Sequence, residues 1–264
     1  ELFMHPLEDD ETAAVRPEIP FDGAITARDL TFAYGDGTPV LRGVSFEIKS
    51  GQTIAIVGRS GSGKTTLAKL LHGALRPTSG ELFFDDQDSR SLSLPAIRRN
   101  VGIVLQDSQL FAGTITENIA YGDDRPELAR VQDAARLAAA HDFIMSFPAR
   151  YNTYLAEGGL GLSGGQRQRV SIARALFRSP RVLIMDEATS ALDGESERAI
   201  IANMPDILRG RTGIVIAHRL TTVKHADRIL VIDDGQIVED GSHDELVAKR
   251  GLYHSLFDRQ FHQG

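Results

Sequence analysis

The first residues with the types and spacing needed for chemistry are residues 58–65, which read GRSGSGKT. They fit the pattern G-x-x-x-x-G-K-[ST] and lie between a short apolar run, residues 53–57, and a run with helical spacing. Glycines let the backbone curl so that successive N–H groups and the start of the next helix point at phosphate oxygens. We expect Lys64 to reach the β and γ phosphates of a nucleotide and the Thr65 hydroxyl to bind Mg²⁺. The predicted phosphate-binding residues are Gly58, Ser60, Gly61, Ser62, Gly63, Lys64, Thr65 and Thr66.

A second candidate is the apolar run 182–185, which ends in two adjacent acids, Asp186 and Glu187. The carboxyl edge of an open α/β sheet is where such folds present chemistry. We expect Asp186 to hold Mg²⁺ through its water shell, and Glu187 to orient or deprotonate a water that attacks the γ phosphate. Alone, the pair could equally be helix-capping acids. Beside a phosphate loop, the catalytic interpretation is favoured.

The third candidate is residues 162–166, LSGGQ, which open a helical pattern that runs to Phe177. Ser163 is suited to be the N-cap, and the two glycines leave the approach to the helix end open. Alone, this pattern favours a capped helix with a Gly-Gly turn. One nucleotide does not need two anion-binding helix ends from one chain, so we expect this end to serve the nucleotide of a partner. The predicted contacts are Ser163, Gly164, Gly165 and Gln166.

These candidates require a sheet that brings them together. Residues 25–49 alternate apolar and polar side chains, which predicts an antiparallel β layer. Short apolar runs separated by helical spacing predict a mostly parallel sheet buried on both faces. We expect these parallel strands at residues 53–57, 182–185, 213–217 and 228–232.

The domain organisation follows from the same patterns. Residues 1–20 mix acids and prolines without periodicity and are predicted to be a linker. Alanine-rich stretches between about 107 and 180 favour a helical subdomain. We therefore predict an α/β fold over 21–264, with a P-loop ATPase core at 21–106 and 181–264, an N-terminal antiparallel layer and a helical subdomain.

Composition excludes several classes of function. The chain has 264 residues, of which 42% are hydrophobic and 25% charged, so it is long enough to bury a large core. A formal charge of −7 gives no basic surface for nucleic acid, and the absence of cysteine excludes thiolate chemistry. No apolar run is long enough to span a bilayer. Because the sequence begins at Glu1, we expect it to be excised from a longer protein.

A phosphate loop, then LSGGQ, then an apolar strand that ends in Asp-Glu, in this order, resembles the ATPase domains of the ATP-binding-cassette (ABC) family. The resemblance covers about residue 21 to the C-terminus and implies ATP and Mg²⁺ as ligands. Tyr34 resembles the aromatic that stacks on adenine, and Gln106 the glutamine that senses Mg²⁺ and couples to transmembrane domains. Residues 190–193, including Asp193, resemble the loop that communicates across a dimer, and His218 the switch histidine at the γ phosphate.

The resemblance also implies partners. Two copies would pack head to tail, with each ATP between the phosphate loop of one copy and Ser163, Gly164 and Gly165 of the other. A complete set of motifs suits a homodimer that hydrolyses two ATP.

Residues 113–119, GTITENI, resemble the segment that follows the coupling glutamine in exporters, whose transmembrane domains share the chain. Glu157 matches a glutamate of the exporter loop, although Ala156 and Gly158 depart from that pattern. We therefore expect a position at the cytoplasmic face of the inner membrane, in the protein-secretion branch or among lipid and drug exporters. The alternative is a soluble ABC ATPase acting on DNA or ribosomes, but such chains carry coiled coils, a second cassette or basic faces.

Overall fold

The fold is described by a computed structural model that covers residues 21–35, 37–106, 109–188, 194–216 and 223–261. The predicted linker, residues 1–20, lies outside the described residues, as do Asp193 and His218. Among the described residues, no helix is both long and apolar enough to cross a membrane.

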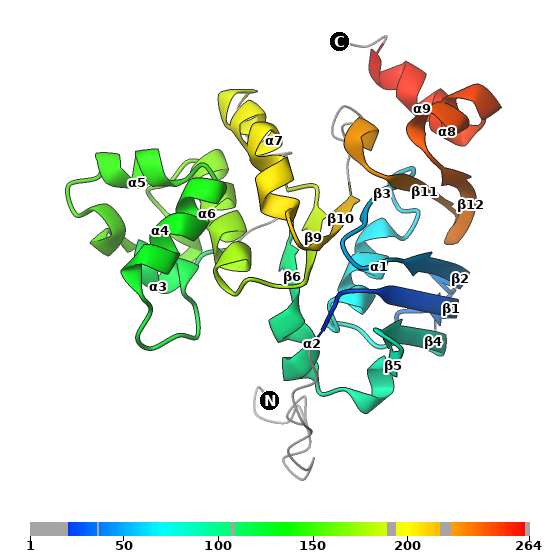
Figure 1. Cartoon of the computed structure of the whole chain (residues 1–264), viewed down its shortest axis with the longest axis horizontal. Helices are drawn as coiled ribbons and strands as arrows, with labels where there is room; N and C mark the ends of the chain where they lie inside the picture. Colours follow the sequence, from blue (N-terminus) through cyan, green and yellow to red (C-terminus); the bar gives the residue numbers. More distant parts are fainter. Residues whose placement is uncertain (1–20, 36, 107–108, 189–193, 217–222, 262–264) are drawn as a thin grey trace.

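A six-stranded sheet forms the centre of the molecule, in the strand order β12-β11-β3-β10-β9-β6 (Figure 1). The five strands from β11 to β6 run parallel, and β12 pairs antiparallel at the edge. Strands β3, β9, β10 and β11 confirm the four predicted apolar runs. The sequence analysis did not predict β6 and β12. The strands are β3 Thr53–Val57, β6 Val101–Val104, β9 Val182–Asp186, β10 Thr212–Ile216, β11 Arg228–Asp233 and β12 Gln236–Gly241.

The predicted antiparallel layer is a second sheet of four strands, in the order β2-β1-β4-β5. Its alternation is as predicted, because Val44, Phe46 and Ile48 are buried while Ser45 and Glu47 face solvent. Strands β4 and β5, which were not predicted, extend the layer beyond the expected hairpin. The strands are β1 Ile25–Phe32, β2 Leu41–Ile48, β4 Ser79–Phe84 and β5 Gln87–Asp88.

Residues 115–177 are mainly helical and lie on one side of the central sheet, opposite the antiparallel layer (Figure 1). The region also contains a ribbon of two short strands, β7 Gly113–Thr114 and β8 Tyr154–Leu155, which the alanine-rich pattern did not predict. The helices are α3 Ile115–Ile119, α4 Leu128–Leu137, α5 His141–Ser146 and α6 Gly164–Phe177.

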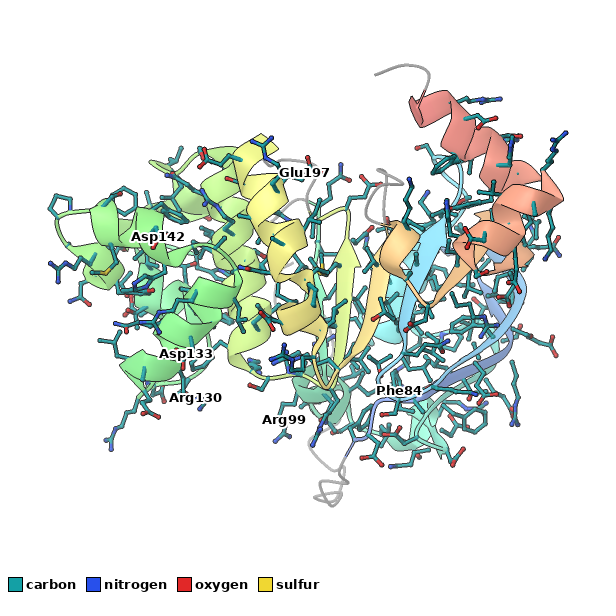
Figure 2. All side chains as sticks on the ribbon, turned by 45° about the horizontal axis from the view of Figure 1, so that its top comes forward. Phe84, Arg99, Arg130, Asp133, Asp142 and Glu197 are labelled. Atoms are coloured by element: carbon teal, nitrogen blue, oxygen red, sulfur yellow. The ribbon has the colours of Figure 1, made fainter. Side chains whose placement is uncertain are left out.

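The remaining helices are α1 Lys64–Leu71, α2 Leu94–Asn100, α7 Gly194–Leu208, α8 His243–Lys249 and α9 Leu252–Phe261. Buried apolar side chains form separate clusters: α1 packs under the antiparallel sheet with Phe84, whereas α3, α4 and α6 pack together on the other side of the central sheet. Figure 2 shows Phe84 within the first cluster and Arg130, Asp133 and Asp142 on the helical side.

Candidate active site

The carboxyl ends of four parallel strands define the edge at which the candidate residues meet. In the register of the sheet, Ile216 at the end of β10 pairs with Ile56 of β3 and with Asp186 of β9, and Val104 at the end of β6 pairs with Met185. The phosphate loop follows β3, Asp186 ends β9 and is followed by Glu187, and Gln106 follows β6. The strand order thus brings together residues from separate parts of the sequence, as open α/β sheets do at this edge.

The phosphate loop owes its shape to glycine. Gly61 and Gly63 have φ angles of 78° and 106°, in the left-handed region where a side chain is strained. At Gly58, an added Cβ would lie 2.1 Å from the carbonyl oxygen of Ile232 on the neighbouring strand β11. The loop then enters α1 directly, because Gly63 is the N-cap and Lys64 the first helical residue. The backbone is therefore arranged as an anion-binding helix start.

Lys64 is folded back over this loop. Its Nζ donates hydrogen bonds to the carbonyl oxygens of Gly58, at 3.0 Å, and Arg59, at 2.8 Å. Burial lowers the pKa of Lys64, and the negative charges of Glu187 and Asp186 act against that shift. A desolvated ammonium attracts the negative phosphates of a nucleotide, and the two carboxylates nearby attract the cation that such a nucleotide carries.

Asp186 is the most enclosed acid at the edge, with 2% of its surface exposed. Burial raises the pKa of Asp186, and a hydrogen bond from the Thr65 hydroxyl opposes the rise. Several buried side-chain polar atoms of the described residues have no hydrogen-bond partner, and two of them, Asp186 Oδ1 and Ser62 Oγ, lie at this edge. Buried polar atoms are normally satisfied, so these two are open to hydrogen bonds from a ligand or an ordered water.

Glu187 follows Asp186, the last residue of β9, at a bend of the backbone. Its φ of 49° is left-handed, which is uncommon for a residue with a side chain, and its N–H donates to the carbonyl oxygen of Ile216 at 2.9 Å. Backbone strain of this kind concentrates at functional sites. The left-handed backbone of Glu187 interrupts the regular strand geometry after Asp186, so the two adjacent carboxylates can take different roles.

Tyr34 and Gln106 lie at the margins of the site. The Tyr34 ring is half exposed, and its hydroxyl lies 3.4 Å from Thr66 Oγ1 on the helix that follows the phosphate loop. Gln106 is exposed and lines a groove of about 840 Å³ together with Glu157 and Gly164. The groove connects the end of β6 to the start of α6.

Ser163 is the N-cap of α6, as predicted from the sequence. Its Oγ accepts from the N–H of Gln166 at 3.2 Å, and Gln166 Oε1 accepts from the N–H of Ser163 at 2.9 Å, which together form a capping box. Within the chain, α6 and the phosphate-loop helix α1 belong to different apolar clusters and lie on different sides of the central sheet (Figure 1). The structure does not join Ser163, Gly164 and Gly165 to the phosphate loop of the same chain.

Two residues near the site were missed in the sequence. Gln168, with 2% of its surface exposed, donates from Nε2 to the carbonyl oxygen of Leu105 at 3.2 Å, directly beside Gln106. Arg174, on the same helix, donates from Nη1 to the carbonyl oxygen of Gln109, which follows Gln106 in the chain. The sequence signal that could have indicated them is the presence of polar residues among the apolar positions of the helix that follows LSGGQ.

Comparisons with known proteins agree with this geometry. The family model described as "ABC transporter" matches residues 41–190, which is 150 of the 264 residues. An ATP-dependent lipid A-core flippase of Saccharophagus degradans is 48% identical over 90% of this chain and 41% of its own length. The toxin RTX-I translocation ATP-binding protein of Actinobacillus pleuropneumoniae is 49% identical over 98% of this chain and 37% of its own length.

A solved structure gives the same result. A bacterial Atm1-family ABC exporter with ATP bound superposes with a TM-score of 0.87 and 44% identity, over 90% of this chain and 42% of the exporter chain. The chain thus spans about two fifths of the length of these relatives. The family model, the relatives and the solved structure all match the part of the chain that holds the phosphate loop and the two acids, and the chain belongs to the ABC transporter family.

Proposed function

We propose that this chain binds ATP with Mg²⁺ and hydrolyses it as the motor domain of a membrane exporter. The observation that carries the proposal is the arrangement of Lys64 over a glycine-shaped loop beside the buried Asp186. One named relative is a lipid A-core flippase, another is a toxin translocation ATP-binding protein, and the similar solved structure is an ABC exporter. The similar identities of the two relatives to this chain, 48% and 49%, do not favour one cargo over the other. The proposal therefore stops at export driven by ATP.

The residues fit the proposed ligands. Buried Ser62 Oγ and Asp186 Oδ1 are without partners among the described residues, which suits a phosphate and a hydrated cation. No group of three or more His, Asp or Glu side chains in the described part of the chain is arranged to hold a metal ion. Mg²⁺ bound with a nucleotide needs only one or two protein ligands because phosphates and waters fill its octahedron. Thr65 and Asp186 would supply them, with Gln106 at the margin.

Each proposed role follows from position. The loop N–H groups and Lys64 would bind and neutralise the β and γ phosphates, with Thr66 at the helix start, and Mg²⁺ would add charge neutralisation there. Glu187 would orient the attacking water and accept its proton. His218, which follows β10 and lies outside the described residues, is proposed to contact the γ phosphate. The half-exposed Tyr34 ring would stack on the adenine.

We further propose that the site is completed by a second copy of the domain. Ser163, Gly164 and Gly165 present a capped helix start that the chain does not direct at its own phosphate loop, and Gln166 supports that cap. A head-to-tail homodimer would place this helix end on the partner's nucleotide, with Asp193 at the dimer contact. The remaining partners are transmembrane domains of the same transporter, which would hold the dimer at the cytoplasmic face of the membrane.

The first experiment is the mass of the Glu187→Gln variant by light scattering, with and without ATP and Mg²⁺. The amide cannot accept the proton and leaves less negative charge at the γ phosphate, so we expect ATP binding without turnover and a nucleotide-dependent dimer. Glu47→Gln, an exposed change on β2, is the matched control and should hydrolyse ATP like the unmodified chain.

Two results would contradict the proposal. Turnover retained in Glu187→Gln would remove the assigned base. A variant that is loaded with ATP and remains monomeric would contradict the shared site in the isolated domain. Ser163→Ala in a longer chain with its transmembrane part would then decide whether that part is needed for the dimer.

A further inference from the structure

Arg174, on the third turn of α6, holds the segment that follows Gln106. Its Nη1 donates to the carbonyl oxygen of Gln109 at 2.9 Å, and its Nε donates to the carbonyl oxygen of Asn118 at 2.8 Å. The guanidinium also lies 5.0 Å from the centre of the Phe111 ring. One side chain of α6 therefore contacts both the segment after Gln106 and helix α3.

Asn118 extends this contact into a network. It is 1% exposed, and its Oδ1 accepts both from Arg174 Nη2 at 2.8 Å and from the N–H of Phe111 at 2.9 Å. Its Nδ2 donates to the carbonyl oxygens of Phe111, at 2.9 Å, and Thr114, at 3.1 Å. The backbone of Phe111 is thus held on both its donor and its acceptor, and the network is bonded to α6 through Arg174.

The other side of Gln106 is held by the same helix. Gln168 Nε2 donates to the carbonyl oxygen of Leu105 at 3.2 Å. Gln106 is therefore bracketed by two attachments to α6, one at Leu105 and one at Gln109. We name Gln168 and Arg174, which make these two attachments, together with Asn118, which bonds Arg174 to Phe111, the loop clamp.

Arginine is the residue that suits this position. Its planar group directs three donors at three acceptors on two segments while its face covers an aromatic ring. A lysine has a single ammonium that cannot reproduce the fork. The guanidinium of Arg174 is desolvated, which lowers its pKa, and in such an environment its hydrogen bonds to carbonyl oxygens are strong.

The clamp connects two parts of the proposed catalytic cycle. Ser163 caps the start of α6, eleven residues before Arg174, which is roughly 16 Å along the helix axis at 1.5 Å per residue. A helix of 14 residues packed into one core moves as a rigid body. We infer that Arg174 is a positioning residue that makes Gln106, at the chain's own nucleotide, and Ser163, at the partner's nucleotide, move together. This inference rests on the proposed function.

The test compares Arg174→Lys with Arg169→Lys in the full chain. Arg169 is a matched control because it lies on the same helix, donates to the carbonyl oxygen of Ala139 and covers the Phe143 ring at 4.7 Å. Those contacts are to the connection between α4 and α5 and to α5, away from residues 109–121. Amide hydrogen exchange measured without nucleotide shows directly whether the loop clamp holds the backbone of residues 109–121. We expect Arg174→Lys to increase exchange in residues 109–121 and Arg169→Lys to leave that segment unchanged.

Kinetics then separate positioning from stability. For Arg174→Lys we expect ATP affinity to stay within about twofold and kcat to fall about tenfold or more, the size of one lost charge-assisted hydrogen bond in the competent arrangement. Unchanged exchange in 109–121, or increased exchange with normal kcat, would overturn the inference. If Arg174→Lys does not fold, Gln168→Leu decides, since it removes the attachment at Leu105 and is expected to lower kcat in the same way.

The exchange experiment does not depend on hydrolysis. An unmodified chain that hydrolyses no ATP would contradict the proposed function, while the exchange in 109–121 would still show whether Arg174 holds the loop. The two failures are therefore distinguishable.

Discussion

The Nζ of Lys64 donates a hydrogen bond to the carbonyl oxygen of Gly58, 3.0 Å away at the opposite end of the phosphate loop. The lysine therefore bridges the two ends of the loop with a desolvated charge, and most of its stem is buried. Charge and stem make separable contributions, because the first binds anions and the second packs.

Lys64→Met tests this separation. Methionine keeps an apolar stem of similar length and removes an ammonium whose burial is unfavourable, so we expect the thermal unfolding midpoint to stay within about 4 °C, or roughly 1 kcal/mol. ATP affinity should fall more than about tenfold, because a hydrogen bond between charged groups is lost. A fluorescent ATP analogue measures the affinity. Lys49→Met, on the exposed surface, is the control and should change neither the unfolding midpoint nor the ATP affinity. An unaltered ATP affinity in Lys64→Met would show that the lysine does not bind phosphate.

Asp186→Asn should separate stability from function. Burial raises the pKa of Asp186, which means that the folded chain disfavours its charge, and a neutral amide of the same shape relieves this cost. We expect the free energy of unfolding to be equal to or above that of the unmodified chain, while Mg²⁺-dependent ATP turnover falls at least about a hundredfold. Urea unfolding and a turnover assay over a range of Mg²⁺ concentrations measure the two effects. A clear loss of stability with normal turnover would assign Asp186 a purely structural role.

Local patterns predicted the strands that are apolar throughout and the helix that Ser163 caps. Strand β6 was missed because it is only four residues long and contains Gly102, so its sequence, VGIV, gives little signal. It forms through pairing with β9, which is a tertiary effect. The two-residue strands β7 and β8 likewise depend on each other, since such a ribbon has no stability of its own.

The candidate site was predicted in its residue types, and its geometry was not. Spacing indicated that Lys64 and the two acids would share one edge, whereas the anchoring of Lys64 to its own loop depends on a backbone conformation that spacing does not specify. The loop clamp could not be predicted from the sequence for a related reason. Arg174 finds its acceptors on segments that come together only when α3 and α6 pack, so no short window contains them.

His72 predicts a pH dependence of stability. It is the C-cap of α1, where a helix end would favour its charge, yet burial and the neighbouring Arg98 lower the pKa of His72 from 6.5 to about 4. The unfolded chain therefore binds this proton at a higher pH than the folded chain does. The contribution of neutral His72 to stability is complete above pH 6.5 and is lost as the pH falls toward about 4.

His72→Gln should flatten this part of the pH profile. The thermal unfolding midpoint of the unmodified chain is expected to decrease as the pH is lowered from 7 to 4.5. The midpoint of the variant should decrease less over the same interval, because glutamine does not titrate. Thermal unfolding followed by circular dichroism at several pH values gives both curves. Parallel curves would mean that His72 binds its proton equally in both states.

The glycines of the phosphate loop give a matched pair of substitutions. An added Cβ at Gly63, where φ is 106°, would lie 2.7 Å from Leu41 Cδ2 and 3.1 Å from the carbonyl oxygen of Val40. At Gly61, where φ is 78°, it would have no neighbour within 4 Å. Gly61→Ala therefore adds backbone strain alone, whereas Gly63→Ala adds strain and a steric clash.

We expect Gly61→Ala to lower the free energy of unfolding by about 1 kcal/mol and Gly63→Ala by about 3 kcal/mol, since a left-handed alanine costs about 1–2 kcal/mol and overpacking adds about 1–3 kcal/mol. Urea unfolding measures both. The nucleotide affinity of Gly61→Ala carries separate information, because its methyl group would project from the open side of the loop. Suppose that Gly61→Ala binds ATP normally and that Gly63→Ala has the same free energy of unfolding as Gly61→Ala. The loop would then have a different conformation in solution, and the assignment of its backbone N–H groups to phosphate would have to be abandoned.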